Sequence, residues 1–288
     1  MTKTLLGILG SPRKLGNSEL LVKELYRSLP EGWQLKLLRL PELDIRPCKG
    51  CYQCLFGEMR CPLDDDFPLA LDALVKADAC VVAAPAYLLG ANASLKRFLD
   101  RGLSFNAHID RLWNKPAVGA AIAGIVGMEG STKLAVDSFI KMILGDHRGS
   151  VVLYGALPGE IFLTGEGREA AKHLAKALLE QKHSSETSGP VCQLCGGDTF
   201  RFLRNGGLRC MLCSSQGDYE WKEGRLQVRT FAGDHSLFLT YEDVRNHAEW
   251  LRGMKEKFMA MRKELKAVTQ SYTQEGVWIR PQASKDKE

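Results

Sequence analysis

The stretch Leu5-Leu-Gly-Ile-Leu9, followed by Gly10-Ser-Pro-Arg-Lys-Leu-Gly-Asn-Ser18, decides the fold class of this chain. Its first part is a short apolar run, as in a buried strand, and its second part is rich in glycine and polar residues. A helical stripe with leucines four residues apart follows at Leu21, Leu25 and Leu29. The stretch therefore predicts a strand, a loop and a helix in succession, which is the opening unit of an α/β fold.

The same alternation continues to residue 183. Further apolar runs predict strands over residues 35–40, 79–84, 117–123 and 151–154. The helices between and after them are predicted over 67–76, through Leu95 to Leu103, over 133–144 and through Ala171 to Leu178. The run 79–84 is apolar at every position, as expected of a strand buried on both faces. Five strands that alternate with helices predict a doubly wound, five-stranded parallel sheet over residues 1–183.

Composition points to an intracellular, water-soluble protein. Hydrophobic residues make up 45% of the 288-residue chain and charged residues 25%, as in ordinary globular proteins. No apolar run is long enough to cross a bilayer, and the N-terminus has no signal-peptide layout, so we expect a cytoplasmic protein without a membrane partner. The net charge of +5 is small for this length and argues against nucleic acid as a partner.

A second, smaller unit is predicted behind the α/β part. Residues 184–190 are polar, end in Gly-Pro and have no periodicity, so we interpret them as a linker. Two C-x2-C pairs then follow within residues 191–232, Cys192 with Cys195 and Cys210 with Cys213, among strand-like segments at 199–203, 219–221 and 226–230. This spacing predicts a zinc ribbon, with a single rubredoxin-like iron as the main alternative.

A long amphipathic helix is predicted over residues 240–270, and residues 281–288 form a polar tail. Thr240 and Asp243 form a capping-box start. Apolar or seam residues then recur in steps of three and four, at Val244, His247, Leu251, Met254, Phe258, Met261, Leu265 and Val268. Two interpretations have equal weight: this heptad seam binds a partner helix, or it packs on the chain's own domain.

Four cysteines lie within fourteen residues at Cys48, Cys51, Cys54 and Cys61. Spacings of two, two and six residues allow their sulfurs to share one metal centre, and consecutive C-x2-C-x2-C spacing recurs in iron–sulfur proteins. We therefore favour an iron–sulfur cluster on the loop 48–61, and leave zinc or free, redox-active thiols as alternatives. The six histidines are scattered without pairing to one another or to the cysteines, so none is a candidate ligand.

Three loops follow the predicted strands and meet at the carboxyl edge of the sheet. In the first, a glycine-rich turn runs into a helix, so backbone N–H groups and the positive end of the helix dipole converge as in a phosphate cradle. The second and third suit a flat aromatic ring. The predicted cofactor-binding residues are Ser11, Arg13, Gly16, Asn17, Ser18, Pro85, Ala86, Tyr87, Leu88, Leu89, Gly90, Asn92, Ala123, Gly124, Gly127, Glu129 and Gly130.

These motifs together resemble a known family. The segments Gly10-Ser-Pro-Arg-x-x-Gly-Asn-Ser, Cys-x-Gly-Cys-x-x-Cys with a later Cys-Pro-Leu-Asp-Asp-Asp, and Pro-x-Tyr with Leu-Lys-Arg-Phe-Leu-Asp-Arg resemble the NADPH-dependent FMN reductases and, among them, the iron–sulfur flavoproteins. The resemblance covers roughly residues 1–180. It implies a flavodoxin-like fold, non-covalent FMN, a 4Fe-4S cluster on Cys48, Cys51, Cys54 and Cys61, and a homodimer or tetramer.

The leading functional hypothesis is an FMN-dependent electron-transfer oxidoreductase that passes electrons from NAD(P)H or a ferredoxin-like donor to a small acceptor. One alternative is a plain NAD(P)H-dependent FMN, quinone or nitro-compound reductase whose metal sites hold only structural zinc. Another is a redox-sensing protein that docks partners through the ribbon and the C-terminal helix. No catalytic acid or base stands out in the sequence.

Overall fold

The computed structural model of the chain describes residues 2–180 and 189–279. The chain divides into two compact units, one up to Ala248 and one from Glu249 on. The first unit contains the parallel sheet, its helices and the cysteine ribbon, and the second contains the rest of the C-terminal helix. Of the predicted connecting segments, linker residues 184–188 and the tail 281–288 lie outside the described residues.

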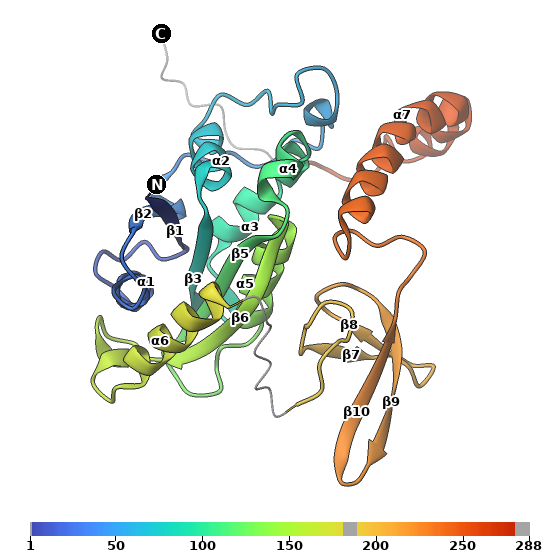
Figure 1. The fold of residues 1–288 in the computed structure, drawn as a ribbon. Helices are drawn as coiled ribbons and strands as arrows, with labels where there is room; N and C mark the ends of the chain where they lie inside the picture. The colour runs from blue at the N-terminus through green and yellow to red at the C-terminus, as the bar shows by residue number, and fades with distance from the viewer. Residues whose placement is uncertain (1, 181–188, 280–288) are drawn as a thin grey trace. The chain divides into compact units, whose positions relative to one another are not determined.

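A parallel sheet with the strand order β2-β1-β3-β5-β6 forms the centre of the first unit (Figure 1). Its strands are β1 (Lys3–Leu9), β2 (Trp33–Arg39), β3 (Ala79–Tyr87), β5 (Lys115–Ala123) and β6 (Gly145–Tyr154), and a two-residue strand β4 (Gly90–Ala91) pairs antiparallel with β3. This is the flavodoxin-like order, in which the winding reverses between β1 and β3. The predicted fold class and all five predicted strands of the sheet are confirmed.

Helices cover both faces of the sheet. The helices α1 (Asn17–Arg27) and α6 (Glu166–Leu179) share one apolar core with it, and α2 (Phe67–Lys76), α3 (Ala93–Leu99) and α5 (Thr132–Met142) share the other. Strand β3 supplies both cores: Val82 belongs to the second and Val81 to the first. Successive side chains of a strand point to opposite faces, and helices cover both faces, so both residues are fully buried.

Short helical turns complete this part of the chain. They are α4 (Ile109–Leu112) and the 3-10 turns η1 (Leu40–Glu42), η2 (Gln53–Leu55), η3 (Gly102–His108) and η4 (Glu160–Phe162). The helix predicted through Leu95 to Leu103 is shorter than expected, since α3 ends at Leu99 and the chain tightens into η3. There the ring of Phe105 packs against those of Phe98 and Phe67, at centroid distances of 5.6 and 6.4 Å. Aromatic packing from η3 thus replaces the last turn of the predicted helix.

A separate antiparallel sheet carries the second group of cysteines. Its strands β7 (Phe200–Phe202), β8 (Leu208–Cys210), β9 (Gln216–Lys222) and β10 (Arg225–Phe231) lie in the order β10-β9-β8-β7 (Figure 1). Three of these strands were predicted from the sequence. The fourth, β8, was not, because its three residues show no period and, unlike those of β7, do not lie within a longer strand-like stretch.

The helix α7 (Tyr241–Gln270) begins as predicted. The backbone N–H of Thr240 donates to the carboxylate of Asp243 at 2.8 Å, and the N–H of Asp243 donates to the hydroxyl of Thr240 at 3.1 Å, which is a reciprocal capping box. One expectation is wrong: His235 and His247 do pair, with 2.8 Å between ring nitrogens. The turn before α7 brings them together, and sequence spacing does not show this.

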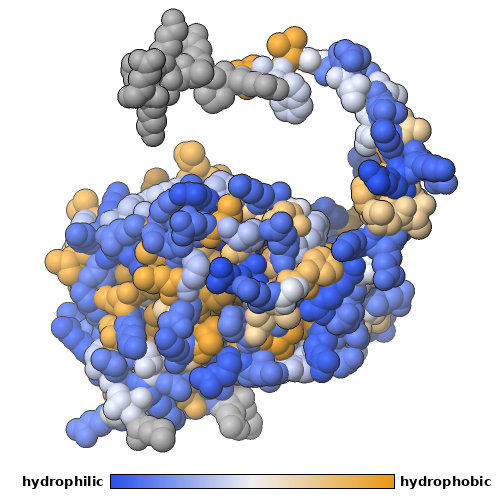
Figure 2. All heavy atoms as spheres, turned by 90° about the horizontal axis from the view of Figure 1, so that it is seen from above, coloured by the Kyte–Doolittle hydropathy of each residue, from blue (hydrophilic) through white to orange (hydrophobic). Residues whose placement is uncertain are grey.

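Within the first unit, Val244 and Ala248 of α7 are buried. In the second unit, the seam residues Phe258, Met261, Leu265 and Val268 are exposed, so a partner helix for this segment stays a prediction. Figure 2 shows hydrophobic side chains exposed among hydrophilic ones on the face that it draws. Of the helices in the described residues, none combines the length and the apolar character needed to cross a membrane.

Candidate functional site

A cavity of about 240 Å³ opens at the carboxyl edge of the parallel sheet, where β1, β3, β5 and β6 end. It is lined by Ser11, Arg13, Gly16, Asn17, Ser18, Pro85, Ala86, Tyr87, Ile122, Gly124, Gly155, Ala156 and Pro158. All five residues predicted from the first loop are among them, with Pro85, Ala86, Tyr87 and Gly124 from the other two. The structure thus brings together the glycine-rich loop and the first residues of both predicted ring loops.

The first loop is built as a cradle around the start of α1. Gly16 precedes the helix, and a Cβ at this position would lie 3.1 Å from the Cβ of Arg13 and 3.3 Å from its carbonyl oxygen. The loop therefore closes tightly on a residue without a side chain. The first N–H groups of a helix have no acceptor within it, so those of Asn17 and Ser18, both lining the cavity, are suited to a phosphate.

The side chain of Asn17 does not extend toward a ligand. Its amide nitrogen donates to the carbonyl oxygen of Gly155 at 2.9 Å, and its oxygen accepts from the N–H of Gly159 at 2.8 Å. Arg13 donates to the carbonyl oxygen of Ala156 at 3.0 Å. These bonds hold the loop after β6 against the cradle. Asn17 therefore shapes the cavity through its neighbours, and its backbone N–H is the group available to a phosphate.

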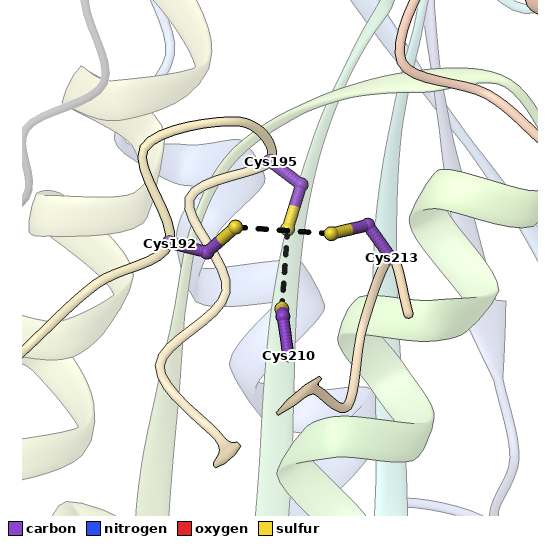
Figure 3. A group of neighbouring side chains, drawn as sticks. All are labelled: Cys192, Cys195, Cys210 and Cys213. Atoms are coloured by element: carbon purple, nitrogen blue, oxygen red, sulfur yellow. Dashed lines mark hydrogen bonds between the residues drawn. The ribbon is translucent and has the colours of Figure 1, made fainter. Parts of the chain in front are cut away.

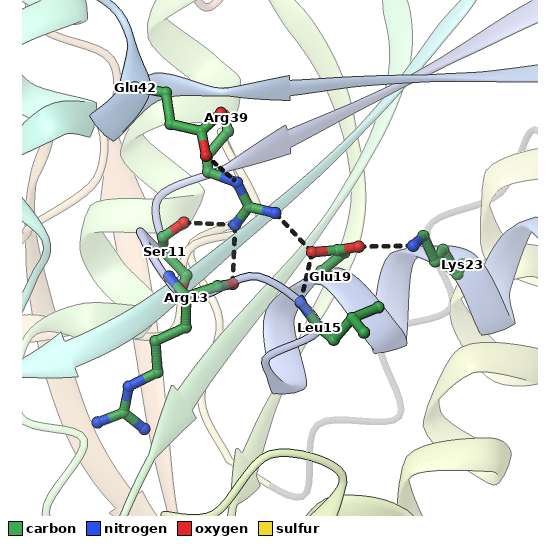
Figure 4. A network of polar contacts seen from close by, with 7 residues as sticks. All are labelled: Ser11, Arg13, Leu15, Glu19, Lys23, Arg39 and Glu42. Carbon is green, nitrogen blue, oxygen red and sulfur yellow. Dashed lines mark hydrogen bonds and ion pairs between the residues drawn. The ribbon is translucent and has the colours of Figure 1, made fainter.

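A network of charged side chains supports the cradle from the side of β2 (Figure 4). Arg39, the last residue of β2, donates to the carbonyl oxygens of Ser11 and Arg13 at 2.8 and 2.9 Å and to the carboxylate of Glu19. Lys23 also pairs with Glu19. Burial by itself would raise the pKa of Glu19, but these donors and the N–H of Leu15 lower it from 4.5 to about 2. Glu19 thus stays ionised and fully paired at the base of the loop.

Other predicted residues lie outside the cavity, namely Leu88, Leu89, Gly90, Asn92, Ala123, Gly127, Glu129 and Gly130. Asn92 caps α3, since its side-chain oxygen accepts from the N–H of Ser94 at 2.9 Å. The carboxylate of Glu129 accepts from the hydroxyl of Tyr154 at 2.8 Å. Ser131 donates from its backbone to the carbonyl oxygen of Leu89 at 2.8 Å, so the two ring loops are joined. These residues shape the rim of the site, and their contact with a cofactor stays a prediction.

The first four cysteines share a second cavity. Cys48, Cys51, Cys54 and Cys61 all line one space of about 210 Å³, together with Arg101, Ser104 and residues of their own loop. Left-handed backbone at Gly50 and Tyr52 (φ 62° and 58°) turns the chain back between the cysteines. Among the described residues, these four cysteines do not form a group close enough to hold a single metal ion, unlike Cys192, Cys195, Cys210 and Cys213. The cavity therefore has the donor set for a cluster, with the sulfurs spread around it.

The sulfurs of Cys192, Cys195, Cys210 and Cys213 lie within 4.8 Å of one another (Figure 3). Cys192 and Cys213 are 3.7 Å apart and Cys195 and Cys210 are 3.6 Å apart, sulfur to sulfur. Each C-x2-C pair closes a turn, in which Gly196 and Ser214 donate to the carbonyl oxygens of Cys192 and Cys210. Four mostly buried thiols that point to one centre can hold a tetrahedral metal ion.

The sequence missed some residues of both cavities. Gly155, Ala156 and Pro158 follow β6, and the end of that strand at the same sheet edge is a signal that could have found them. Arg39 carries no such signal, because a single arginine in a strand is usually exposed. Arg101 ends the motif Leu-Lys-Arg-Phe-Leu-Asp-Arg, but the motif does not show its contact with Cys61. Their roles depend on which chain segments the fold brings beside them.

A doubly wound sheet in the order β2-β1-β3-β5-β6, with a cavity at its carboxyl edge beside a glycine-rich loop and a helix N-terminus, places the chain in the flavodoxin-like class. A comparison with family models identifies the particular family. Residues 4–150 match the family described as NADPH-dependent FMN reductase, and the chain belongs to it. This is a family of flavin-dependent NAD(P)H:acceptor oxidoreductases, and membership implies FMN and an NAD(P)H donor.

Among curated proteins, the chain is similar to an iron-sulfur flavoprotein of Methanocaldococcus jannaschii, with 30% identity over 188 residues, 61% of this chain and 95% of that one. It is also similar to an iron-sulfur flavoprotein of Archaeoglobus fulgidus, with 29% identity over 222 residues, 75% of this chain and 96% of that one.

Among solved structures, one titled flavone reductase matches with a TM-score of 0.71 and 19% identity, over 97% of this chain and all of that one. That likeness extends beyond the flavodoxin-like part, so it supports the fold with its added cysteine ribbon and long helix. The suspected family and the fold class are both confirmed.

Proposed function

We propose that the protein is an iron–sulfur flavoprotein that passes electrons from NAD(P)H or a ferredoxin-like donor through FMN and a 4Fe-4S cluster to a small acceptor. The cluster would be held by Cys48, Cys51, Cys54 and Cys61. One observation carries this proposal: the four sulfurs line a single cavity, although they are separated by up to thirteen residues of chain. The names of the curated relatives support it. The second cysteine group is proposed to hold a structural zinc ion.

The chain's own residues would bind and orient both groups. The first turn of α1 and Arg13 would hold the FMN phosphate, and Pro85 and Tyr87 would lie against the ring. When bound, FMN exchanges electrons in pairs and singly, and a cluster carries one at a time, so together they join two-electron donors to one-electron carriers. Tyr87 is 40% exposed and Leu88 fully exposed beside the cavity, which favours a flat, apolar acceptor at this mouth.

The clustered thiols need reducing surroundings, so the cytoplasm remains the proposed location. A homodimer or tetramer also remains a proposal, based on the resemblance that the sequence shows. The residue roles proposed for FMN and the cluster do not depend on the location or on the oligomeric state.

A second candidate is a plain NAD(P)H-dependent flavin, quinone or nitro-compound reductase whose metals are structural. It is favoured by the match of residues 4–150 to the family described as NADPH-dependent FMN reductase, since that description names no cluster. A single zinc ion would need the four sulfurs of the first group about 2.3 Å from one centre, whereas a 4Fe-4S cluster takes each sulfur on a different iron. The two candidates therefore differ in what the first group binds.

Metal analysis of anaerobically purified protein tests the choice. We expect about four irons and about one zinc per chain, with cluster absorption beside the flavin bands. Cys51→Ser should lose the iron and keep zinc and FMN, and Cys213→Ser should lose the zinc. Cys80→Ala is the matched control, because Cys80 lies in β3, outside both groups, and is fully buried. An iron-free wild type with about two zincs would refute the cluster and favour the plain reductase.

A further inference from the structure

Two charged side chains are fully buried beside the first cysteine cavity. Arg101 and Asp65 form an ion pair in which both side chains have 0% exposure. Arg101 follows the end of α3, and Asp65 precedes α2, so the pair joins two parts of the chain 36 residues apart. Charged residues are rarely buried unless they are fully bonded, because their desolvation costs several kcal/mol per ion in real proteins. The hydrogen bonds around this pair must therefore offset the desolvation of both ions.

The contacts hold the guanidinium group of Arg101 in one orientation. Its terminal nitrogens donate to the two carboxylate oxygens of Asp65 at 2.7 and 3.3 Å, and one of them also donates to the carbonyl oxygen of Arg46 at 3.1 Å. Its central carbon lies 4.5 Å from the ring centre of Phe67. Asp65 is in turn held by the N–H groups of Arg46 and Phe67, at 2.9 and 3.1 Å. Neither side chain of the pair can turn without losing several bonds.

One donor of this guanidinium points to a cysteine. The Nε of Arg101 lies 3.1 Å from the Sγ of Cys61, which lines the same cavity as Cys48, Cys51 and Cys54. Cys61 needs an external anchor more than the other three cysteines, since six residues separate it from Cys54 and only two separate each of the other neighbouring pairs. The chain between them passes through left-handed turns at Gly57 and Met59, with φ of 59° and 53°. The buried pair supplies such an anchor.

We propose that Arg101, held by Asp65, is the positioning residue of the cluster's fourth ligand and donates an N–H to the sulfur of Cys61 when the cluster is bound. This proposal rests on the proposed function, since it takes Cys61 as a cluster ligand. Groups that orient metal ligands change metal affinity by 10–100-fold, and N–H donors to cluster sulfurs tune the reduction potential. Because such a bond stabilises the more negatively charged, reduced cluster, its removal should lower the midpoint potential.

Three variants separate this role from a purely structural one. Arg101→Lys keeps the charge but cannot reproduce the forked contacts, and Arg101→Met with Asp65→Asn removes both charges, so that no unpaired ion is left in the interior. Arg97→Lys is the matched control, because Arg97 is an exposed arginine of α3, the helix that ends two residues before Arg101. Each protein is reconstituted anaerobically with iron and sulfide. The measurements are iron release to a chelator, midpoint potential by EPR-monitored titration, FMN content and Tm.

We expect both Arg101 variants to release iron about 10–100-fold faster and to have a lower midpoint potential. The double variant should have a Tm and an FMN content close to those of the wild type but should not recover the cluster properties. If the double variant also recovers iron retention and potential, or if Arg101→Lys matches Arg97→Lys, Arg101 has only a structural role and the proposal is overturned. A wild type that takes up no iron would overturn the proposed function, and this proposal with it, and metal analysis shows that result before any variant is compared.

Discussion

Replacing Arg39 by methionine would remove the brace of the phosphate cradle while keeping most of the side chain's volume. Arg39 is 11% exposed and Glu19 8% exposed, so their ion pair is nearly buried. The substitution removes a charged donor from the carbonyl oxygens of Ser11 and Arg13 and from Glu19. It leaves Glu19 with Lys23 and the N–H of Leu15. The carboxylate of Glu19 therefore loses one donor but keeps two others.

The expected cost follows from these contacts. A hydrogen bond to a charged group contributes about 1.5–3 kcal/mol, and breaking a buried pair by removing one partner costs about 3–5 kcal/mol. Since Glu19 keeps two donors and water can reach part of the loop, we expect the free energy of unfolding to fall by about 3 kcal/mol. If FMN binding must then re-form the loop, a share of roughly 1.4–3 kcal/mol appears as a 10–100-fold higher Kd.

Urea unfolding of FMN-free protein measures the first quantity, and quenching of FMN fluorescence on titration measures the second. Arg27→Met is the matched control, because Arg27 lies on α1 and pairs with Glu24 at 3.3 Å while 76% exposed. Such exposed pairs contribute about 0–1 kcal/mol, so we expect little change in either quantity. If Arg39→Met destabilises the fold but leaves the Kd for FMN within twofold of wild type, the network supports the sheet and not the cradle, and our reasoning fails.

Three further predictions concern the ring loops, acid stability and the ribbon metal. Gly130→Ala should lower FMN content and Tm, because Gly130 has φ of 53° and a Cβ there would lie 2.2 Å from the carbonyl oxygen of Leu89. Gly127→Ala is the control: φ is 76°, but no atom lies within 4 Å of the added Cβ, so Tm should fall less and FMN content should be unchanged. The pKa of Glu19 in the folded protein is depressed from 4.5 to about 2, so its stabilising effect is full above pH 4.5 and is lost as the pH falls toward 2. In Glu19→Gln, the free energy of unfolding in urea should depend less on pH over this range. An unchanged pH dependence would contradict the role given to Glu19. A thiol-reactive mercurial should release about one zinc from Cys192, Cys195, Cys210 and Cys213 and lower Tm. Tm should fall because Cys195 packs in the same buried apolar cluster as Phe139 of α5, so loss of the metal should loosen that cluster. Metal release without a change in Tm would contradict this coupling.

Strong local patterns made most of the fold predictable. The run that became β3 is apolar at every position, and both of its faces are buried, so its pattern had one interpretation. The capping box at Thr240 and Asp243 also depends only on residues three apart. In contrast, the end of α3 at Leu99 depends on Phe105 packing against rings from two other elements, which no local pattern carries. Elements set by tertiary packing were therefore those that sequence reasoning missed.

The candidate site shows the same division. Ser11, Gly16 and Ser18 could be predicted because strand, loop and helix follow one another directly, and the cavity is lined by all three. Asn17 was predicted as a ligand contact, yet its side chain bonds to Gly155 and Gly159, more than 130 residues away in the chain. A polar residue in a glycine-rich loop has the same appearance in both roles. Only the placement of β6 beside the loop distinguishes them.

Arg39 and Arg101 hold the two ends of the loop between β2 and α2. Arg39 ends β2 and fixes the flavin cradle, and Arg101 fixes Asp65 and Cys61 at the far end of the cysteine loop. This loop contains the short 3-10 turns η1 and η2, and hydrogen bonds between Asp44 and Asp66 also join its two ends. Because each arginine is held by its own nearly or fully buried contacts, removing one should affect its own site and leave the other unchanged. We therefore expect Arg39→Met to reduce FMN affinity without iron loss, and Arg101→Lys to speed iron loss without altering FMN affinity, whereas equal effects on both would indicate that the segment unfolds as one unit.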